Sequence, residues 1–172
     1  AQNIFVIIPV KPDVRVTFTK VSADAEFTAG NDEYAYAGAT YDIYDASTDQ
    51  KIATITTDES GQASYQLQQD KRYYAVETKA PQGFKLNTER HYFTTGSSDS
   101  SEELADSPGA VRLTIQKKDS ATLDAAQPGA TLEGAEYRLT DANGRVQTAV
   151  TNEDGLLVFQ DIPFGTCTVV ET

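Results

Sequence analysis

Two lysines and two glutamates occupy corresponding positions in the two halves of this 172-residue chain. Lys20 and Glu77 belong to the first half, and Lys117 and Glu171 to the second. Each lysine continues an alternating row of apolar residues, and so does Glu171. Because alternation in a strand places every second side chain on one face, these charged groups are predicted to point inward. An inward ammonium and an inward carboxylate can form a buried ion pair. Alternatively, burial disfavours their charged forms and leaves a neutral amine beside a protonated carboxyl.

The strands that carry the lysines are predicted from residues 14–20 and 111–117. In both segments apolar residues alternate with Arg, Thr or Gln, and the lysine falls at the end of the apolar row. Lys118 falls on the opposite face, so Lys117 is the counterpart of Lys20. For Glu77 the face is ambiguous from the sequence, because Tyr73 and Tyr74 would point in opposite directions.

The pattern around these residues occurs twice. The lysines are separated by 117 − 20 = 97 positions, and Gly61 is separated from Gly155 by 155 − 61 = 94. A near-constant spacing of this size indicates two copies of one module. We therefore expect a first module at residues 14–107 and a second at 108–172, truncated at its C-terminal end. Residues 1–13 are expected to be a lead-in strand or the remnant of a preceding module.

Short strands separated by tight turns are the only secondary structure that the sequence predicts. Turn signals that contain glycine end at Gly61, Gly144 and Gly155, and no stretch has sustained helical periodicity. Residues 95–107 are polar and acidic, as expected of a loop that leads to a short last strand. The predicted fold class is all-β, with tandem antiparallel β-sandwich modules.

The composition excludes several classes of function. A formal net charge of −12 argues against nucleic-acid binding, which needs a basic surface. No apolar run is long enough to span a bilayer, so we expect no membrane contact. The single cysteine forms no intrachain disulfide, and the single histidine has no neighbouring Cys or His to bind a metal. Neither a metal nor a cofactor is predicted.

An ordered set of motifs gives the chain a family resemblance. The order is Lys20, then Gly-Ala-x-Tyr-x-x-x-Asp at 38–45, then Thr-x-x-x-Gly at 57–61, then Tyr-Ala-Val-Glu-Thr-Lys-Ala-Pro-Gln-Gly-Phe at 74–84. This order resembles the Cna protein B-type domain, a prealbumin-like sandwich of Gram-positive pilins and surface adhesins. The resemblance covers nearly all of residues 14–172, once completely and once in part.

The resemblance implies a self-made isopeptide bond. In that family a first-strand lysine joins an Asn or Asp on the last strand, assisted by the glutamate. Carried over, Lys20 is the nucleophile, Glu77 the proton-handling residue and Asp106 the acceptor, in the position where the family usually has Asn. Asn87 and Asp99 are the alternative acceptors. Folding would hold the groups in contact and supply the effective concentration that amide formation needs.

The same resemblance extends to the second module and to the whole protein. Lys117 and Glu171 are expected to be unlinked, with the acceptor beyond the chain end, unless residues 3–10 fill the gap. The implied function is a structural stalk module of an extracellular, cell-wall-anchored pilin or adhesin. Neighbouring modules would be its partners, and its chemistry would be one self-crosslinking event without turnover. The alternative is a module that binds a host matrix protein or a glycan, which an exposed platform of Tyr34, Tyr36 and Tyr44 would favour.

Overall fold

The fold divides into two compact units, each built almost entirely of β-strands. A computed structural model describes residues 6–123 and 126–172. The first unit contains residues 6–23 and 35–106, and the second contains residues 24–34 and 107–172. The sequence boundaries place residues 24–34 in the first module, whereas the structure groups them with the second unit. The prediction of an all-β fold made of prealbumin-like sandwiches is confirmed.

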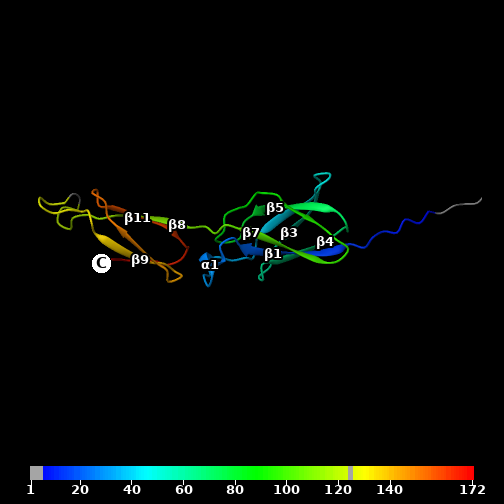
Figure 1. The fold of residues 1–172 in the computed structure, drawn as a ribbon, viewed down its shortest axis with the longest axis horizontal. Helices are drawn as coiled ribbons and strands as arrows, with labels where there is room; N and C mark the ends of the chain where they lie inside the picture. Colours follow the sequence, from blue (N-terminus) through cyan, green and yellow to red (C-terminus); the bar gives the residue numbers. More distant parts are fainter. Residues whose placement is uncertain (1–5, 124–125) are drawn as a thin grey trace, which may run out of the picture. The chain divides into compact units, whose positions relative to one another are not determined.

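The first unit is a sandwich of two sheets (Figure 1). One sheet has three strands in the order β4-β1-β7, which are Gln62–Leu67, Val14–Ser22 and Ser100–Asp106. The other has four strands in the order β3-β2-β5-β6, which are Lys51–Thr56, Thr40–Asp45, Arg72–Lys79 and His91–Thr94. The first strand, β1, is therefore central in its sheet, and both of its edges are paired.

Strand β7 differs from the prediction in its length and its direction. The segment 95–107 was expected to be a loop before a short last strand, but residues 100–106 form a seven-residue strand. Its polar residues point outward while Leu104 and Asp106 are buried, so the acidic composition hid a half-buried strand. This strand pairs with β1 in parallel, while every other pairing in the unit is antiparallel. The register places Leu104 opposite Lys20 and Asp106 opposite Ser22.

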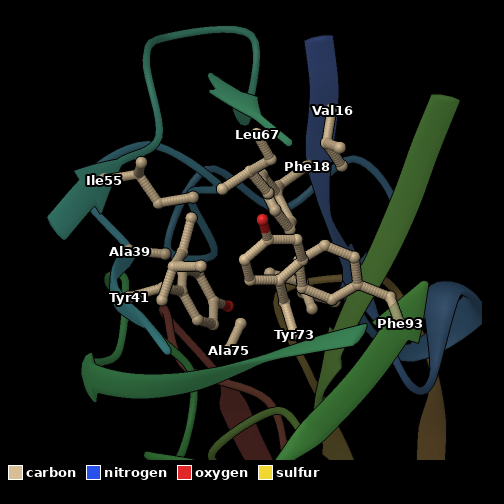
Figure 2. Packing of buried hydrophobic residues seen from close by; sticks show 11 residues of the cluster. Val16, Phe18, Ala39, Tyr41, Ile55, Leu67, Tyr73, Ala75 and Phe93 are labelled. Carbon is tan, nitrogen blue, oxygen red and sulfur yellow. The ribbon is translucent and has the colours of Figure 1, made fainter. Parts of the chain in front are cut away.

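Side chains from both sheets fill the space between the layers of the first unit (Figure 2). Val16 and Phe18 come from β1, and Tyr41 and Ile43 come from β2. All four are at most 4% exposed, as expected for the inward face of two alternating strands. Phe18 packs edge-on against Phe93 of β6, with ring centroids 5.3 Å apart. Lys20 continues this apolar row and is itself buried.

The second unit repeats part of this plan. Its strands form the sheets β10-β9-β12 and β11-β8, which correspond to β3-β2-β5 and β4-β1 of the first unit. The bounds are Val111–Gln116 for β8, Glu136–Thr140 for β9, Val146–Val150 for β10, Leu156–Ile162 for β11 and Thr168–Glu171 for β12. Among residues 107–123 and 126–172, no strand pairs with the second edge of β8. Leu113 and Ile115 are accordingly only partly buried.

Residues 24–34 form an ordered part of the second unit. They include the four-residue helix α1, Ala25–Thr28, which Asp24 caps through the backbone N–H of Phe27. The Asn31 side chain donates to the Asn143 side chain and to the Phe164 carbonyl, both at 2.9 Å. Tyr34 stacks on Phe164 with ring centroids 5.6 Å apart. This segment therefore belongs to the folded structure of the second unit by packing as well as by hydrogen bonding.

The lead-in segment is not a strand where the structure describes it. Residues 6–13 have no assigned secondary structure, and Val6, Ile7, Ile8 and Val10 are exposed. The predicted strand at this end also includes residues 1–5, which lie outside the described residues. Within the described parts of the chain, no helix has the length and hydropathy needed to cross a membrane.

A buried lysine and two carboxylates in the first unit

Lys20 is held at the end of β1 by its backbone and its side chain. Its backbone N–H donates to the Gly61 carbonyl at 2.8 Å. Gly61 has a φ of +75°, and a Cβ at this position would lie 2.7 Å from the Tyr36 Cβ, so the turn requires glycine. The Lys20 side chain is inaccessible to solvent. An ammonium in such a place is costly unless it is paired or neutralised.

The structure brings Lys20, Glu77 and Asp106 together. The Lys20 Nζ lies 2.5 Å from Asp106 Oδ1 and 3.5 Å from Glu77 Oε1. Both carboxylates are about 2% exposed. Glu77 shares the inward face of β5 with Tyr73 and Ala75, which settles the face that was ambiguous in the sequence. Tyr74 is also buried, because it stacks on Tyr44 at the outer face, with centroids 4.9 Å apart.

The Glu77 carboxyl affects the ionisation of Asp106. Burial, reinforced by the Glu77 carboxyl, raises the pKa of Asp106 to about 6, against the lowering effect of Lys20. Glu77 Oε1 and Asp106 Oδ2 are both buried and have no hydrogen-bond partner. Buried polar atoms without partners are uncommon in folded proteins. A proton shared between these two groups would give each of them a partner.

The two alternative acceptors lie elsewhere. The Asp99 side chain accepts a 2.9 Å hydrogen bond from the backbone N–H of Arg15 and is exposed. The Asn87 side chain is also exposed and donates to the Ala105 carbonyl at 3.3 Å. The backbone N–H of Asn87, however, donates to Glu77 Oε2 at 2.9 Å and orients that carboxylate. This backbone contact was not predicted, because sequence patterns report side-chain types and not where a loop aims its N–H groups.

Tyr41 is a further member of the site. Its hydroxyl accepts a 2.9 Å hydrogen bond from Lys20 Nζ, and the residue lies directly opposite Glu77 in the pairing of β2 with β5. Burial and a hydrogen bond with Glu77 raise the pKa of Tyr41 well above its usual range. The signal available in the sequence was the tyrosine at the same position of both copies, Tyr41 and Tyr137.

A hollow lies beside these groups. It has a volume of about 180 Å³ and is lined in part by Tyr41, Glu77 and Asp106. The outer part of its wall includes Asn87, Glu89 and His91. Several of these outer residues are exposed, but Glu77 and Asp106 are themselves only 2% exposed, so the hollow borders the carboxyl groups without opening them to solvent.

The second unit holds the corresponding lysine and glutamate in a more open place. Lys117 Nζ lies 2.5 Å from Glu171 Oε1, and their side chains are 26% and 49% exposed. The backbone N–H of Lys117 donates to the Gly155 carbonyl at 2.8 Å, as Lys20 does to Gly61. The Lys117 contact lowers the pKa of Glu171, and the Glu171 contact raises the pKa of Lys117, as in an ordinary ion pair.

The other candidate residues named from the sequence make packing or ion-pair contacts. Tyr34 is buried in the second unit, Tyr36 packs on Phe84 in the first, and Tyr44 stacks on Tyr74, so these three do not form one exposed platform. His91 Nε2 lies 3.0 Å from Glu102 Oε2. Within residues 6–123 and 126–172, no group of three or more His, Cys, Asp or Glu residues could hold a metal ion.

Solved structures match most of this chain. The Bacillus anthracis TIE protein matches 94% of the chain at 25% sequence identity with a TM-score of 0.61, and the match covers 28% of that protein. A D312A variant of BcpA, the major pilin subunit of Bacillus cereus, matches 93% of the chain and 88% of its own at 12% identity and a TM-score of 0.47. A D295N mutant of the shaft pilin SpaA from Lactobacillus rhamnosus GG matches the same shares at 16% identity and a TM-score of 0.44.

The chain spans less than half the length of the first three solved structures that it resembles, with coverage of 28%, 31% and 42%. No curated protein matches the sequence. A family model, described as the SpaA prealbumin-like fold domain, matches residues 15–107 and again residues 111–172. The two matches include both lysine strands and both glutamate strands. The chain therefore belongs to the family of SpaA prealbumin-like fold domains, and carries two copies of that domain.

Proposed function

We propose that the chain is a pair of structural stalk modules of a cell-wall-anchored surface protein, and that the first module cross-links itself through Lys20 and Asp106. The observation that carries this proposal is the 2.5 Å approach of Lys20 Nζ to Asp106 Oδ1 in a solvent-inaccessible place. The family match and the repetition of the module support a stalk, because a stalk is lengthened by adding copies.

The proposed reaction is a condensation. The Lys20 amine attacks the Asp106 carboxyl carbon, a C–N bond forms, and one carboxyl oxygen leaves as water. The pKa of Asp106, raised to about 6, increases the fraction of neutral carboxyl over that of an ordinary aspartate, and the neutral carboxyl is the better electrophile. Glu77, a neighbour of Asp106 that raises its pKa, is the group that can protonate the departing oxygen. The adjacent hollow can receive the water that is released.

A buried ion pair is the competing interpretation of the same geometry. An ion pair of this kind adds little stability by itself, because desolvation of both charges offsets their attraction. Condensation removes both charges and leaves an amide in their place. A cross-linked chain is lighter by one molecule of water than a chain with an ion pair, so the mass of the chain distinguishes the two interpretations.

The test is the intact mass of the purified chain. We expect a mass one water below that of the sequence, and a digest in which the peptide containing Lys20 is joined to the peptide containing Asp106. Lys20→Ala and Asp106→Ala should each have the full mass of their own sequence, with no loss of water. Asp99→Ala should stay one water lighter, because Asp99 contacts the backbone of Arg15 and not Lys20. A wild-type mass equal to that of the sequence would show that the pair is only ionic.

A further inference from the structure

We propose that the Tyr41 hydroxyl carries the proton from Lys20 to Glu77 that must move before the amide can form. This inference rests on the proposed cross-link and adds a third catalytic side chain to it. The need for a carrier arises because a protonated amine has no lone pair with which to attack. The proton therefore has to leave Lys20 Nζ inside a site from which solvent is excluded.

Of the two routes from Lys20 to Glu77, direct or through Tyr41, the distances favour the one through Tyr41. Lys20 Nζ donates to the Tyr41 hydroxyl at 2.9 Å, whereas Glu77 Oε1 lies 3.5 Å from Nζ and has no hydrogen-bond partner. Proton transfer needs hydrogen-bond reach, which the first contact has and the second lacks. The strand register places Tyr41 opposite Glu77, and the interaction of the Tyr41 hydroxyl with the Glu77 carboxyl contributes to the raised pKa of Tyr41.

In the second unit, the corresponding tyrosine contacts the glutamate. Tyr137 lies opposite Glu171 in the pairing of β9 with β12, and its hydroxyl donates to Glu171 Oε2 at 3.0 Å. Lys117 Nζ lies 6.0 Å from the centroid of the Tyr137 ring. One tyrosine position therefore contacts the lysine in one unit and the glutamate in the other. Since both units share this arrangement, the hydroxyl belongs to the lysine–glutamate site and does not only fill the core.

The step balances in protons and charge. Lys20 passes one proton to the Tyr41 oxygen while Tyr41 passes its own hydroxyl proton to the Glu77 carboxylate. The products are a neutral amine, an unchanged tyrosine and a neutral Glu77. The amine then attacks the Asp106 carboxyl, and Glu77 gives its proton to the leaving oxygen, which departs as water. The nitrogen loses its surplus proton back to Glu77, so the sequence ends with the amide, one water and a protonated Glu77.

A tyrosine suits this relay because it stays protonated. Burial and the Glu77 contact raise the pKa of Tyr41, so the hydroxyl keeps a proton to donate while its oxygen accepts another. A phenylalanine would keep the packing of the ring against the core and remove only this hydroxyl. The substitution Tyr41→Phe therefore separates the chemical role of the residue from its packing role.

The experiment follows the cross-link in time. Chains collected unfolded from inclusion bodies are refolded by dilution, and the fraction that has lost water is followed by intact mass while circular dichroism follows folding. The variants are Tyr41→Phe and the matched control Tyr73→Phe, which also removes one buried hydroxyl from the same core. We expect Tyr41→Phe to fold at the wild-type rate and to cross-link at least ~10-fold more slowly. Tyr73→Phe should cross-link at the wild-type rate.

The outcomes separate this inference from the proposed function. Wild-type chains that fold and lose no water would overturn both the cross-link and the relay. Wild-type chains that lose water, with Tyr41→Phe equally fast, would overturn the relay alone. If Tyr41→Phe does not fold, the relay is tested with 4-aminophenylalanine and 4-methylphenylalanine at position 41. Both side chains fill the space of the hydroxyl, but only the amino group can relay a proton. Equal cross-linking rates for these two would overturn the relay, and a faster 4-amino variant would support it.

Discussion

At the scale of single residues, the site places one cation between two carboxyl groups and one hydroxyl. Lys20 Nζ contacts Asp106 and Tyr41 directly, and Glu77 lies slightly farther away. Because all four side chains are buried, small changes in proton position decide whether the site is an ion pair or a set of neutral reactants. The pH dependence of the reaction should therefore report on these groups.

Cross-linking during refolding should slow as the pH rises from 6 to 8. The pKa of Asp106 is about 6, so above that value the neutral carboxyl is depleted about tenfold for each pH unit. The rate of water loss, measured by intact mass at each pH, should fall in the same proportion. The groups that face Asp106 are Lys20, Glu77 and Tyr41.

Residues in the wall of the hollow provide the control for this pH profile. His91, the single histidine of the sequence, lies in that wall. The variant His91→Gln should keep the wild-type profile, since Asp106 and not the imidazole sets it. A rate that increases from pH 6 to 8 in the wild type would contradict the assignment of a neutral Asp106 as the electrophile.

The leaving group offers a second test at Asp106. In Asp106→Asn the side chain has nearly the same shape, and attack by Lys20 would release ammonia in place of water. We expect the intact mass of this variant to be lower by one ammonia. High-resolution mass spectrometry distinguishes the two losses. Loss of water from Asp106→Asn would show that the acceptor is another carboxyl group.

At the scale of elements, one tight turn fixes the lysine. The Gly61 carbonyl accepts the backbone N–H of Lys20, and the Gly155 carbonyl accepts that of Lys117. Both turns are closely packed, since a Cβ added at Gly155 would lie only 2.9 Å from the Lys117 carbonyl oxygen. Thr57 supports the first turn by donating to the Tyr36 carbonyl at 2.6 Å. The repeated Thr-x-x-x-Gly motif is thus the local structure that positions each lysine.

Gly61→Ala should destabilise the first unit more than Gly38→Ala. Both glycines have positive φ, so alanine at either one is strained by roughly 1 kcal/mol. A Cβ at Gly38 meets nothing within 4 Å, whereas at Gly61 it meets the Tyr36 Cβ at 2.7 Å. Thermal unfolding of both variants in an Asp106→Ala background, where no cross-link forms, measures the difference. Equal melting temperatures would show that the turn tolerates the contact.

How far the sequence predicts these elements depends on the kind of information that each one needs. Alternation was sufficient to place Lys20 on the inward face of β1, because strand periodicity is local. It was not sufficient for β7, whose acidic residues resemble a loop and whose burial depends on a strand at the other end of the unit's sequence. The contacts of Glu77 with Tyr41 and with the Asn87 backbone also depend on partners that only the fold brings together.

At the scale of the whole chain, the two units differ in how completely their lysine strands are enclosed. Strand β1 has a partner on each edge, and Val16 and Phe18 are fully buried. In the described part of the second unit β8 pairs with β11 alone, and Val111 is 44% exposed. We infer that the two units contribute separate unfolding transitions, and that the proposed cross-link would affect only one of them.

Glu77→Gln should lower the melting temperature of one transition and leave the other in place. The variant keeps the Lys20–Asp106 pair but removes the proton-handling group, so the loop between residues 20 and 106 stays open. By the chain-entropy argument used for disulfides, closing a loop of this length stabilises the fold by roughly 4–5 kcal/mol. This corresponds to a decrease of roughly 20 °C for a domain of this size. Differential scanning calorimetry measures both transitions.

The control for this comparison is Asp99→Asn, which changes an exposed carboxylate of the same unit. Its melting profile should match that of the wild type, because surface contacts of this kind contribute little. A Glu77→Gln protein that retains the mass of the cross-linked form and the wild-type transitions would show that Glu77 is dispensable.

The parallel pairing of β1 with β7 has a mechanical consequence. Because the two strands run in the same direction, the chain enters the first unit at one end of the strand pair and leaves at the other. A tensile load applied along the chain would enter at Val14, follow β1 as far as Lys20 and cross directly to Asp106. The covalent link would then exclude the 106 − 20 = 86 intervening steps from the load path, which is roughly 290 Å of extended chain that pulling could not release.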